Sequence, residues 1–164
     1  MKKRRFALAA AILSGVVLSS QLMLPNPAAA MTCGVRKMTV ELDIFNFVTG
    51  ADVKSRYRIS GTYCWDGKWA YPTDGDPILT FISGSRAGLE QKGWSLSPFT
   101  HYATNWVNLR YTVGCPAFPF PSFHYVWWYP RISVSPNGVA TYYKGSVDYG
   151  GAACIYLTPK IISY

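Results

Sequence analysis

The stretch Arg56–Tyr71, RYRISGTYCWDGKWAY, decides the fold class of this chain. Its first ten residues alternate as a β-strand requires, because neighbouring side chains of a strand point to opposite faces of the sheet. One face receives Tyr57, Ile59, Gly61, Tyr63 and Trp65, and the other receives Arg56, Arg58, Ser60, Thr62 and Cys64. Asp66-Gly67 follows directly and precedes a second β-rich segment. An Asp-Gly pair in this position predicts a hairpin with a type I′ turn, in which both central residues have positive φ.

The same period of two recurs along the rest of the chain. It is clear in Met38–Ile44, in Asn105–Cys115 and in the aromatic segment His124–Tyr129. Pro136-Asn137-Gly138 lies between two β-rich runs and predicts a second hairpin. The only segment compatible with a helical turn is residues 85–92. We therefore expect an all-β chain, an antiparallel two-sheet β-sandwich of about 8–9 strands, with a β-barrel as the alternative.

Residues 1–30 have the layout of a cleaved secretory signal peptide. A basic patch, Lys2–Arg5, precedes an apolar run, Phe6–Leu24, and the small residues Ala28-Ala29-Ala30 follow. This order predicts cleavage after Ala30, and a single secreted β domain over residues 31–164, extracellular or associated with the cell wall. The Arg4-Arg5 pair leaves both the general and the twin-arginine export routes open. The chain has no Asn-x-Ser/Thr sequon, which favours a bacterial source, and no later stretch is expected to span a membrane.

The charge of the mature domain is modest. The whole chain carries +8, but four of its sixteen basic residues leave with the signal peptide, so that residues 31–164 carry +4. Such a charge suits solubility and a mild attraction to anionic surfaces. It does not indicate a nucleic-acid partner, and none is expected.

Four cysteines lie in the predicted mature domain, and an even number in an exported chain predicts two disulfides. We expect Cys33–Cys154, which would tie the two ends, and Cys64–Cys115, which would link two interior strands; the two other connectivities remain open. The sequence has no Cys-x-x-Cys pair and no neighbouring histidines, so a zinc site is not expected.

The sequence contains no recognisable catalytic motif. It has two histidines, His101 and His124, but no Gly-x-Ser-x-Gly elbow, no phosphate loop and no dinucleotide fingerprint. We therefore expect a non-enzymatic protein without metal or cofactor. The enzyme alternative predicts one of the two histidines in a concave pocket beside a carboxylate.

Aromatic residues are unusually frequent, at 25 of the 134 residues of the predicted mature domain, and they concentrate in Phe118–Tyr129. In a strand over this segment, Phe123, Tyr125, Trp127 and Tyr129 share one face, while His124, Val126 and Trp128 share the other. Trp127 and Trp128 therefore cannot both point into one core. If they are not core residues, Tyr125, Trp127, Trp128 and Tyr129 are the candidates for a ligand-binding surface.

Two classes of function fit these features. The first is a binding module for polysaccharide of the cell surface or the surroundings, or for a cell-wall polymer, acting through the aromatic segment. The second is a secreted inhibitor or antibacterial factor that contacts a protein or envelope target through a stiff loop, Pro116–Pro121. A basic stripe of Lys54, Arg56 and Arg58 could contact anionic polymers or headgroups, or could simply be a solvated strand face.

Overall fold

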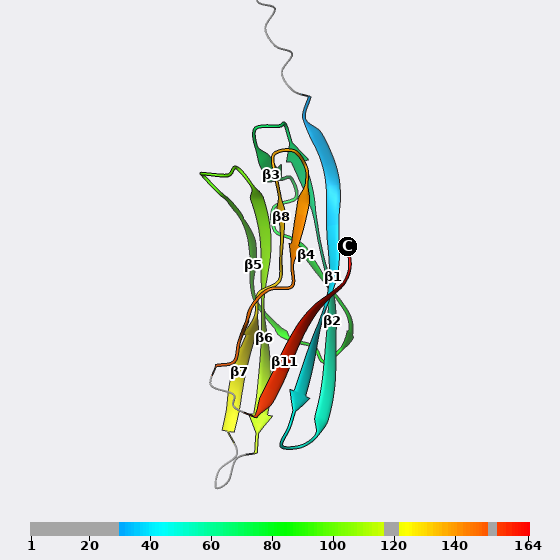
Figure 1. Cartoon of the computed structure of the whole chain (residues 1–164), viewed down its shortest axis with the longest axis vertical. Coiled ribbons are helices and arrows are strands. Elements are labelled where there is room, and N and C mark those ends of the chain that lie inside the picture. The colour runs from blue at the N-terminus through cyan, green and yellow to red at the C-terminus, as the bar shows by residue number, and fades with distance from the viewer. Residues whose placement is uncertain (1–29, 117–121, 151–153) are drawn as a thin grey trace, which may run out of the picture.

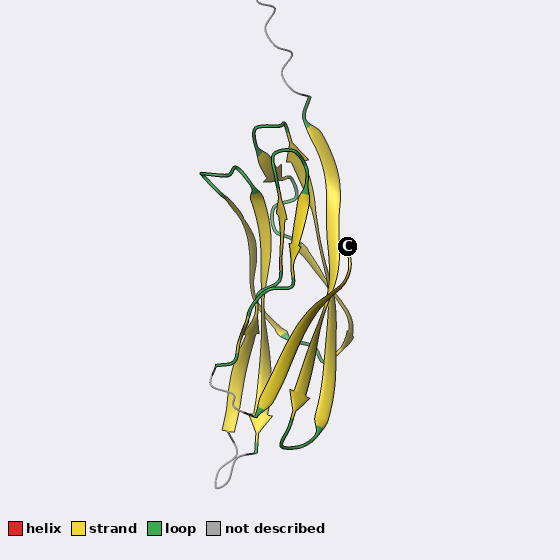
Figure 2. Cartoon of the chain, viewed as in Figure 1, coloured by secondary structure: helices red, strands yellow, loops and turns green. Residues whose placement is uncertain are grey.

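The computed structural model of the chain describes residues 30–116, 122–150 and 154–164. The predicted signal peptide, apart from Ala30, and residues 117–121 of the predicted proline-rich loop lie outside these ranges. The described residues form strands and loops without a helix, as Figure 2 shows, so the segment at 85–92 is not helical. No helix that could serve as a membrane span is therefore present among them.

The strands form two antiparallel sheets that face each other (Figure 1). The first sheet has the order β11-β1-β2-β3, and β4 pairs with β2 beyond the end of β3. Its strands are β1 (Thr32–Asn46), β2 (Ala51–Trp65), β3 (Ala70–Pro72), β4 (Ile78–Gly84) and β11 (Ile155–Ser163). The two sheets remain separate, which confirms the sandwich and not the barrel.

The second sheet is built around β6 (Ala103–Cys115). Along one edge β6 pairs with β5 (Gly88–Leu96). Along its other edge it pairs first with β8 (Arg131–Val134) and then with β7 (Ser122–Trp128). Two short strands complete this sheet, β9 (Ala140–Tyr143) beside β8 and β10 (Val147–Asp148) beside β7. The strands β7 and β8 therefore form one interrupted line along β6.

The core lies between the inner faces of the two sheets. Its residues are those that the alternation along each strand points to the inner face. Met38, Val40, Leu42 and Ile44, which alternate along β1, are buried, as are Tyr57, Ile59 and Tyr63 of β2. From the second sheet come Val107, Leu109, Tyr111, Val126, Trp128, Ile132 and Val134, all buried. Burial raises the pKa of the Tyr63 and Tyr111 phenols well above the ordinary value of 10.0.

The predicted hairpin at Asp66-Gly67 joins β2 to β3, but its turn is not type I′. Trp65 pairs with Ala70, and of the two turn residues only Gly67 has a positive φ, 84°. Asp66 instead holds the turn through its side chain, since Oδ1 accepts hydrogen bonds from the N–H groups of Trp69 at 2.6 Å and Lys68 at 2.8 Å. These two bonds lower the pKa of Asp66.

The two disulfides are Cys33–Cys64 and Cys115–Cys154, so the expected pairs Cys33–Cys154 and Cys64–Cys115 are wrong. Cys33 lies directly opposite Cys64 in the β1–β2 register, with Cα atoms 4.0 Å apart. Cys154 instead precedes β11, whose first residue pairs with Asn46 at the far end of β1. Because β1 carries the chain roughly 40 Å from Cys33 to that end, a Cys33–Cys154 bond is geometrically excluded.

The second disulfide connects the two sheets, because Cys115 ends β6 and Cys154 precedes β11. It closes the end of the sandwich opposite to Cys33–Cys64 (Figure 1). Two disulfides in a domain of this size indicate an oxidising, extracellular environment.

Candidate functional site

The strand β7 separates its aromatic residues onto two faces, as its alternation predicts. Val126 and Trp128 point into the core, whereas Phe123 and Tyr125 are 77% and 48% exposed on the outer face of the second sheet. Trp127 lies on this outer face too and is partly buried. Trp127 and Trp128 therefore point in opposite directions.

Trp128 does not belong to a surface site, which corrects its place among the candidate binding residues. Its side chain is 0% exposed, and its indole Nε1–H donates a hydrogen bond of 2.6 Å to the backbone carbonyl of Lys144. The inner face of β7 meets the first sheet, and Trp128, which points to that face, is therefore a core residue. The bond to Lys144 anchors the loop after β9 to this core.

The outward row continues beyond β7 through Tyr129. The carbonyl of Pro130 accepts a hydrogen bond from Val107 N–H of β6, so the chain stays against β6 between β7 and β8. Pro130 and Ile132 are buried, whereas Tyr129 is partly buried and Arg131 exposed. We call Phe123, Tyr125, Trp127 and Tyr129 the aromatic row; its three members on β7 follow one another at a spacing of about 6.6–7 Å along the strand.

The row is held in place by its neighbours. The Arg110 guanidinium lies over the Tyr125 ring, with its Cζ 4.6 Å from the ring centroid, and forms an ion pair of 2.7 Å with Glu90. Tyr125 and Trp127 contact each other with ring centroids 6.1 Å apart. Held by these contacts, the rings of Tyr125 and Trp127 have little rotamer freedom left to lose when a ligand binds.

Gly150 explains why Trp127 is only partly exposed. A Cβ at this position would lie 2.9 Å from Cζ3 of Trp127 and 2.1 Å from the Tyr125 carbonyl oxygen. The backbone at Gly150, with φ of 52°, therefore packs tightly against the strand and supports one edge of the indole. Trp127 is thus fixed in orientation, with part of its ring open to solvent.

A pocket of about 510 Å³ lies next to Tyr129, at the edge where β8, β9 and the loop after β9 approach Ile161 of β11 in the first sheet. We call it the tyrosine pocket; its walls are Tyr129, Arg131, Tyr142, Tyr143, Lys144, Gly145, Ser146 and Ile161. Arg131 pairs with Tyr143 in the β8–β9 register, and its Cζ lies 4.5 Å from the centroid of that ring. Of the predicted binding residues, Tyr129 is the one that lines this pocket. Arg131, Tyr143 and Lys144 are not among the predicted binding residues, although the predicted Pro136-Asn137-Gly138 hairpin brings their segments together.

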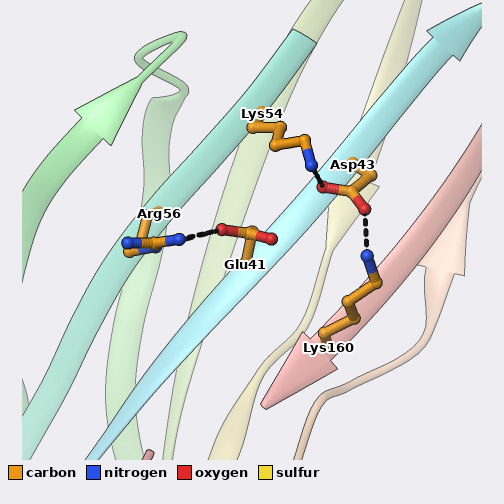
Figure 3. A network of polar contacts seen from close by, with 5 residues as sticks. All are labelled: Glu41, Asp43, Lys54, Arg56 and Lys160. Carbon is orange, nitrogen blue, oxygen red and sulfur yellow. Dashed lines mark hydrogen bonds and ion pairs between the residues drawn. The ribbon is translucent and has the colours of Figure 1, made fainter. Parts of the chain in front are cut away.

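The predicted basic stripe on the first sheet is largely neutralised within the sheet. Arg56 forms an ion pair of 2.5 Å with Glu41, and Lys54 lies 3.9 Å from Asp43, as Figure 3 shows. Asp43 also accepts a hydrogen bond from Lys160, which raises the pKa of that lysine. Lys54 is exposed on this face whereas Glu41 is buried, and the charges are balanced between neighbouring strands.

The two histidines have structural partners. His101 stacks on Trp69 with ring centroids 3.6 Å apart, and its Nδ1 lies 3.0 Å from the carbonyl of Lys68. His124 Nε2 lies 2.8 Å from the hydroxyl of Ser122, two residues away on the same strand. Within the described ranges neither histidine forms an ion pair with a carboxylate, and neither lines the tyrosine pocket. Groups of three or more His, Cys, Asp or Glu side chains that could hold a metal ion are not found in those ranges either.

No protein-family model, curated protein or solved structure matches this chain.

Proposed function

We propose that this chain is exported through its predicted signal peptide and binds polysaccharide of the cell surface or the surroundings without chemical turnover. The observation that carries the proposal is the aromatic row on the outer face of the second sheet. Flat aromatic rings at a regular spacing offer apolar faces on which successive sugar rings can stack. The strand β7 holds Phe123, Tyr125 and Trp127 in register, so that little conformational entropy is lost on binding.

The surrounding polar groups support the same proposal. Arg110 and Thr112 lie on the outer face of β6, opposite Trp127 and Tyr125 of the row. Sugar hydroxyls need such donors and acceptors at the border of an apolar platform, because polar groups fix the orientation of a ligand. The disulfides fit a module that works outside the cell, where they persist.

The test is a fluorescence titration of the oxidised mature domain with soluble glycans, together with pull-downs on insoluble cell-wall material. We expect saturable quenching that is lost in Trp127→Ala and weakened in Tyr125→Ala. Trp94→Ala is the matched control, since Trp94 is 43% exposed on β5 and does not belong to the aromatic row. Loss of binding in the control alone, or no binding across a broad glycan panel, would overturn the proposal and direct the search to protein partners of the Pro116–Pro121 segment.

A further inference from the structure

The tyrosine pocket carries positive charge without a balancing carboxylate. Two of its walls are Arg131 and Lys144, and no Asp or Glu lines it. Neither cation takes part in an ion pair among the described residues. The residues outside those ranges contain no Asp or Glu at all, so they cannot supply a partner. By contrast, Arg110 next to the row is already paired with Glu90.

The carboxylate that comes closest along the chain is engaged elsewhere. Asp148 of β10 accepts a hydrogen bond of 3.0 Å from the Gly150 N–H and is exposed. It pairs with Trp127 in the β10–β7 register and does not line the pocket. The pocket is therefore lined by two cations and three tyrosine side chains, without a carboxylate.

The walls of the pocket are positioned before any ligand binds. Arg131 lies against Tyr143, and Tyr142 stacks on Tyr164 with ring centroids 4.9 Å apart and planes inclined by 15°. The Lys144 backbone is held by the Trp128 indole. Gly145, with φ of 84°, keeps the loop close to β7, since a Cβ there would lie 2.3 Å from the Tyr129 carbonyl oxygen.

From this geometry we propose that the tyrosine pocket binds a sugar unit that carries an anionic group, so that the polysaccharide is acidic. The inference rests on the proposed function and names its ligand class. Sugar rings stack on the aromatic row, and the anionic group of one sugar unit binds the cations of the tyrosine pocket next to Tyr129. A guanidinium offers a planar fork of N–H donors that matches a carboxylate or a phosphate. The neighbouring ammonium of Lys144 adds a second positive charge, and the tyrosine hydroxyls serve the sugar hydroxyls.

The test uses amide chemical shifts of the mature domain during titrations with sodium glucuronate, glucose 6-phosphate and glucose. We expect saturable shifts at Arg131, Tyr143 and Lys144 with the anionic sugars, with dissociation constants in the millimolar range, and none with glucose. The stronger of the two anionic probes identifies the group, carboxylate or phosphate. Higher salt should weaken the binding, because partly exposed charges are screened.

The double variant Arg131→Gln/Lys144→Gln should weaken anionic-sugar binding about tenfold or more. Its matched control is Lys37→Gln/Arg58→Gln, which removes the same charge from exposed residues on the outer face of the first sheet. Spectra without ligand show that each variant is folded. Equal weakening in both double variants would overturn the inference, since the effect would then be one of net charge.

Two further outcomes would also overturn the inference. Shifts of equal size with glucose would mean that the pocket takes neutral sugars, and the proposed function would stand. No shifts with any of the three sugars would remove the pocket from the site. The proposed function would then be decided separately by the polysaccharide titration of Trp127→Ala.

Discussion

Trp127 and Trp128 are neighbours in sequence, yet replacing each of them with alanine should have opposite consequences. Trp128 is 0% exposed, packs in the core and donates a hydrogen bond to the Lys144 carbonyl. Trp127 lies on the outer face, partly covered by the backbone at Gly150. The pair therefore provides a test of the sandwich and of the candidate site in one experiment, with chemically identical substitutions.

The expected sizes follow from this placement. Trp128→Ala removes a fully buried ring and leaves a cavity, a change that costs about 3–5 kcal/mol of unfolding free energy. The orphaned carbonyl of Lys144 adds about 1 kcal/mol. Trp127→Ala removes a partly exposed ring and leaves no closed cavity, so we expect about 1–2 kcal/mol. Glycan binding should be lost in Trp127→Ala, where the platform itself is removed.

The assay is equilibrium urea denaturation of the oxidised proteins, followed by far-UV circular dichroism. Single domains typically have only about 5–15 kcal/mol of stability, so the loss expected for Trp128→Ala is a large part of the total. Trp128→Phe serves as a second variant and should cost about 1–3 kcal/mol while retaining glycan binding. Equal destabilisation by the two alanine substitutions, or loss of binding only in the Trp128 variants, would refute the assignment of the two faces of β7.

Three further predictions concern stability. Replacing Cys115 and Cys154 with serine should lower the unfolding free energy by about 4 kcal/mol, given their separation of 39 residues, and an unchanged urea midpoint would contradict this. Gly138→Ala should cost about 1–3 kcal/mol in the same assay, because φ is 77° and the new Cβ would lie 2.3 Å from an indole atom; a neutral effect would argue against this turn. Burial raises the pKa of Tyr63 and Tyr111 in the folded protein, so these tyrosines lose their protons at a lower pH in the unfolded chain. The free energy of unfolding should therefore be retained below about pH 10 and fall above it. Urea titrations of Tyr63→Phe and Tyr111→Phe against pH should show a shallower decline, and an unchanged slope would speak against burial as its cause.

Much of the fold can be predicted from local patterns. The alternation in Met38–Ile44 and Asn105–Cys115 identifies strands and their buried faces, because the pleat sends successive side chains to opposite sides whatever the rest of the chain does. The hairpin at Pro136-Asn137-Gly138 is equally local and is confirmed, with φ of 77° at Gly138. By contrast β5, Gly88–Leu96, has no clear alternation, and it becomes a strand by pairing with β6.

Less of the candidate site can be predicted from the sequence. The alternation of β7 separates Trp127 from Trp128, but it does not say which of them faces the core. That choice depends on which side of the second sheet meets the first one. Gly150 and the loop at Lys144–Ser146 complete the site through contacts with a distant part of the chain, and no local pattern indicates them.

The sequence by itself thus determined the fold class, the two faces of each regular strand and the presence of two disulfides, since these depend on short-range geometry and on residue counts. Only the tertiary structure decided how the cysteines pair, which tryptophan is buried and where the cations of the tyrosine pocket gather. These features depend on strand order and on the stacking of the sheets. The pairing of Cys33 with Cys64 illustrates the reason: the length of β1 keeps Cys33 far from Cys154, and only the antiparallel register brings the correct partner to its side.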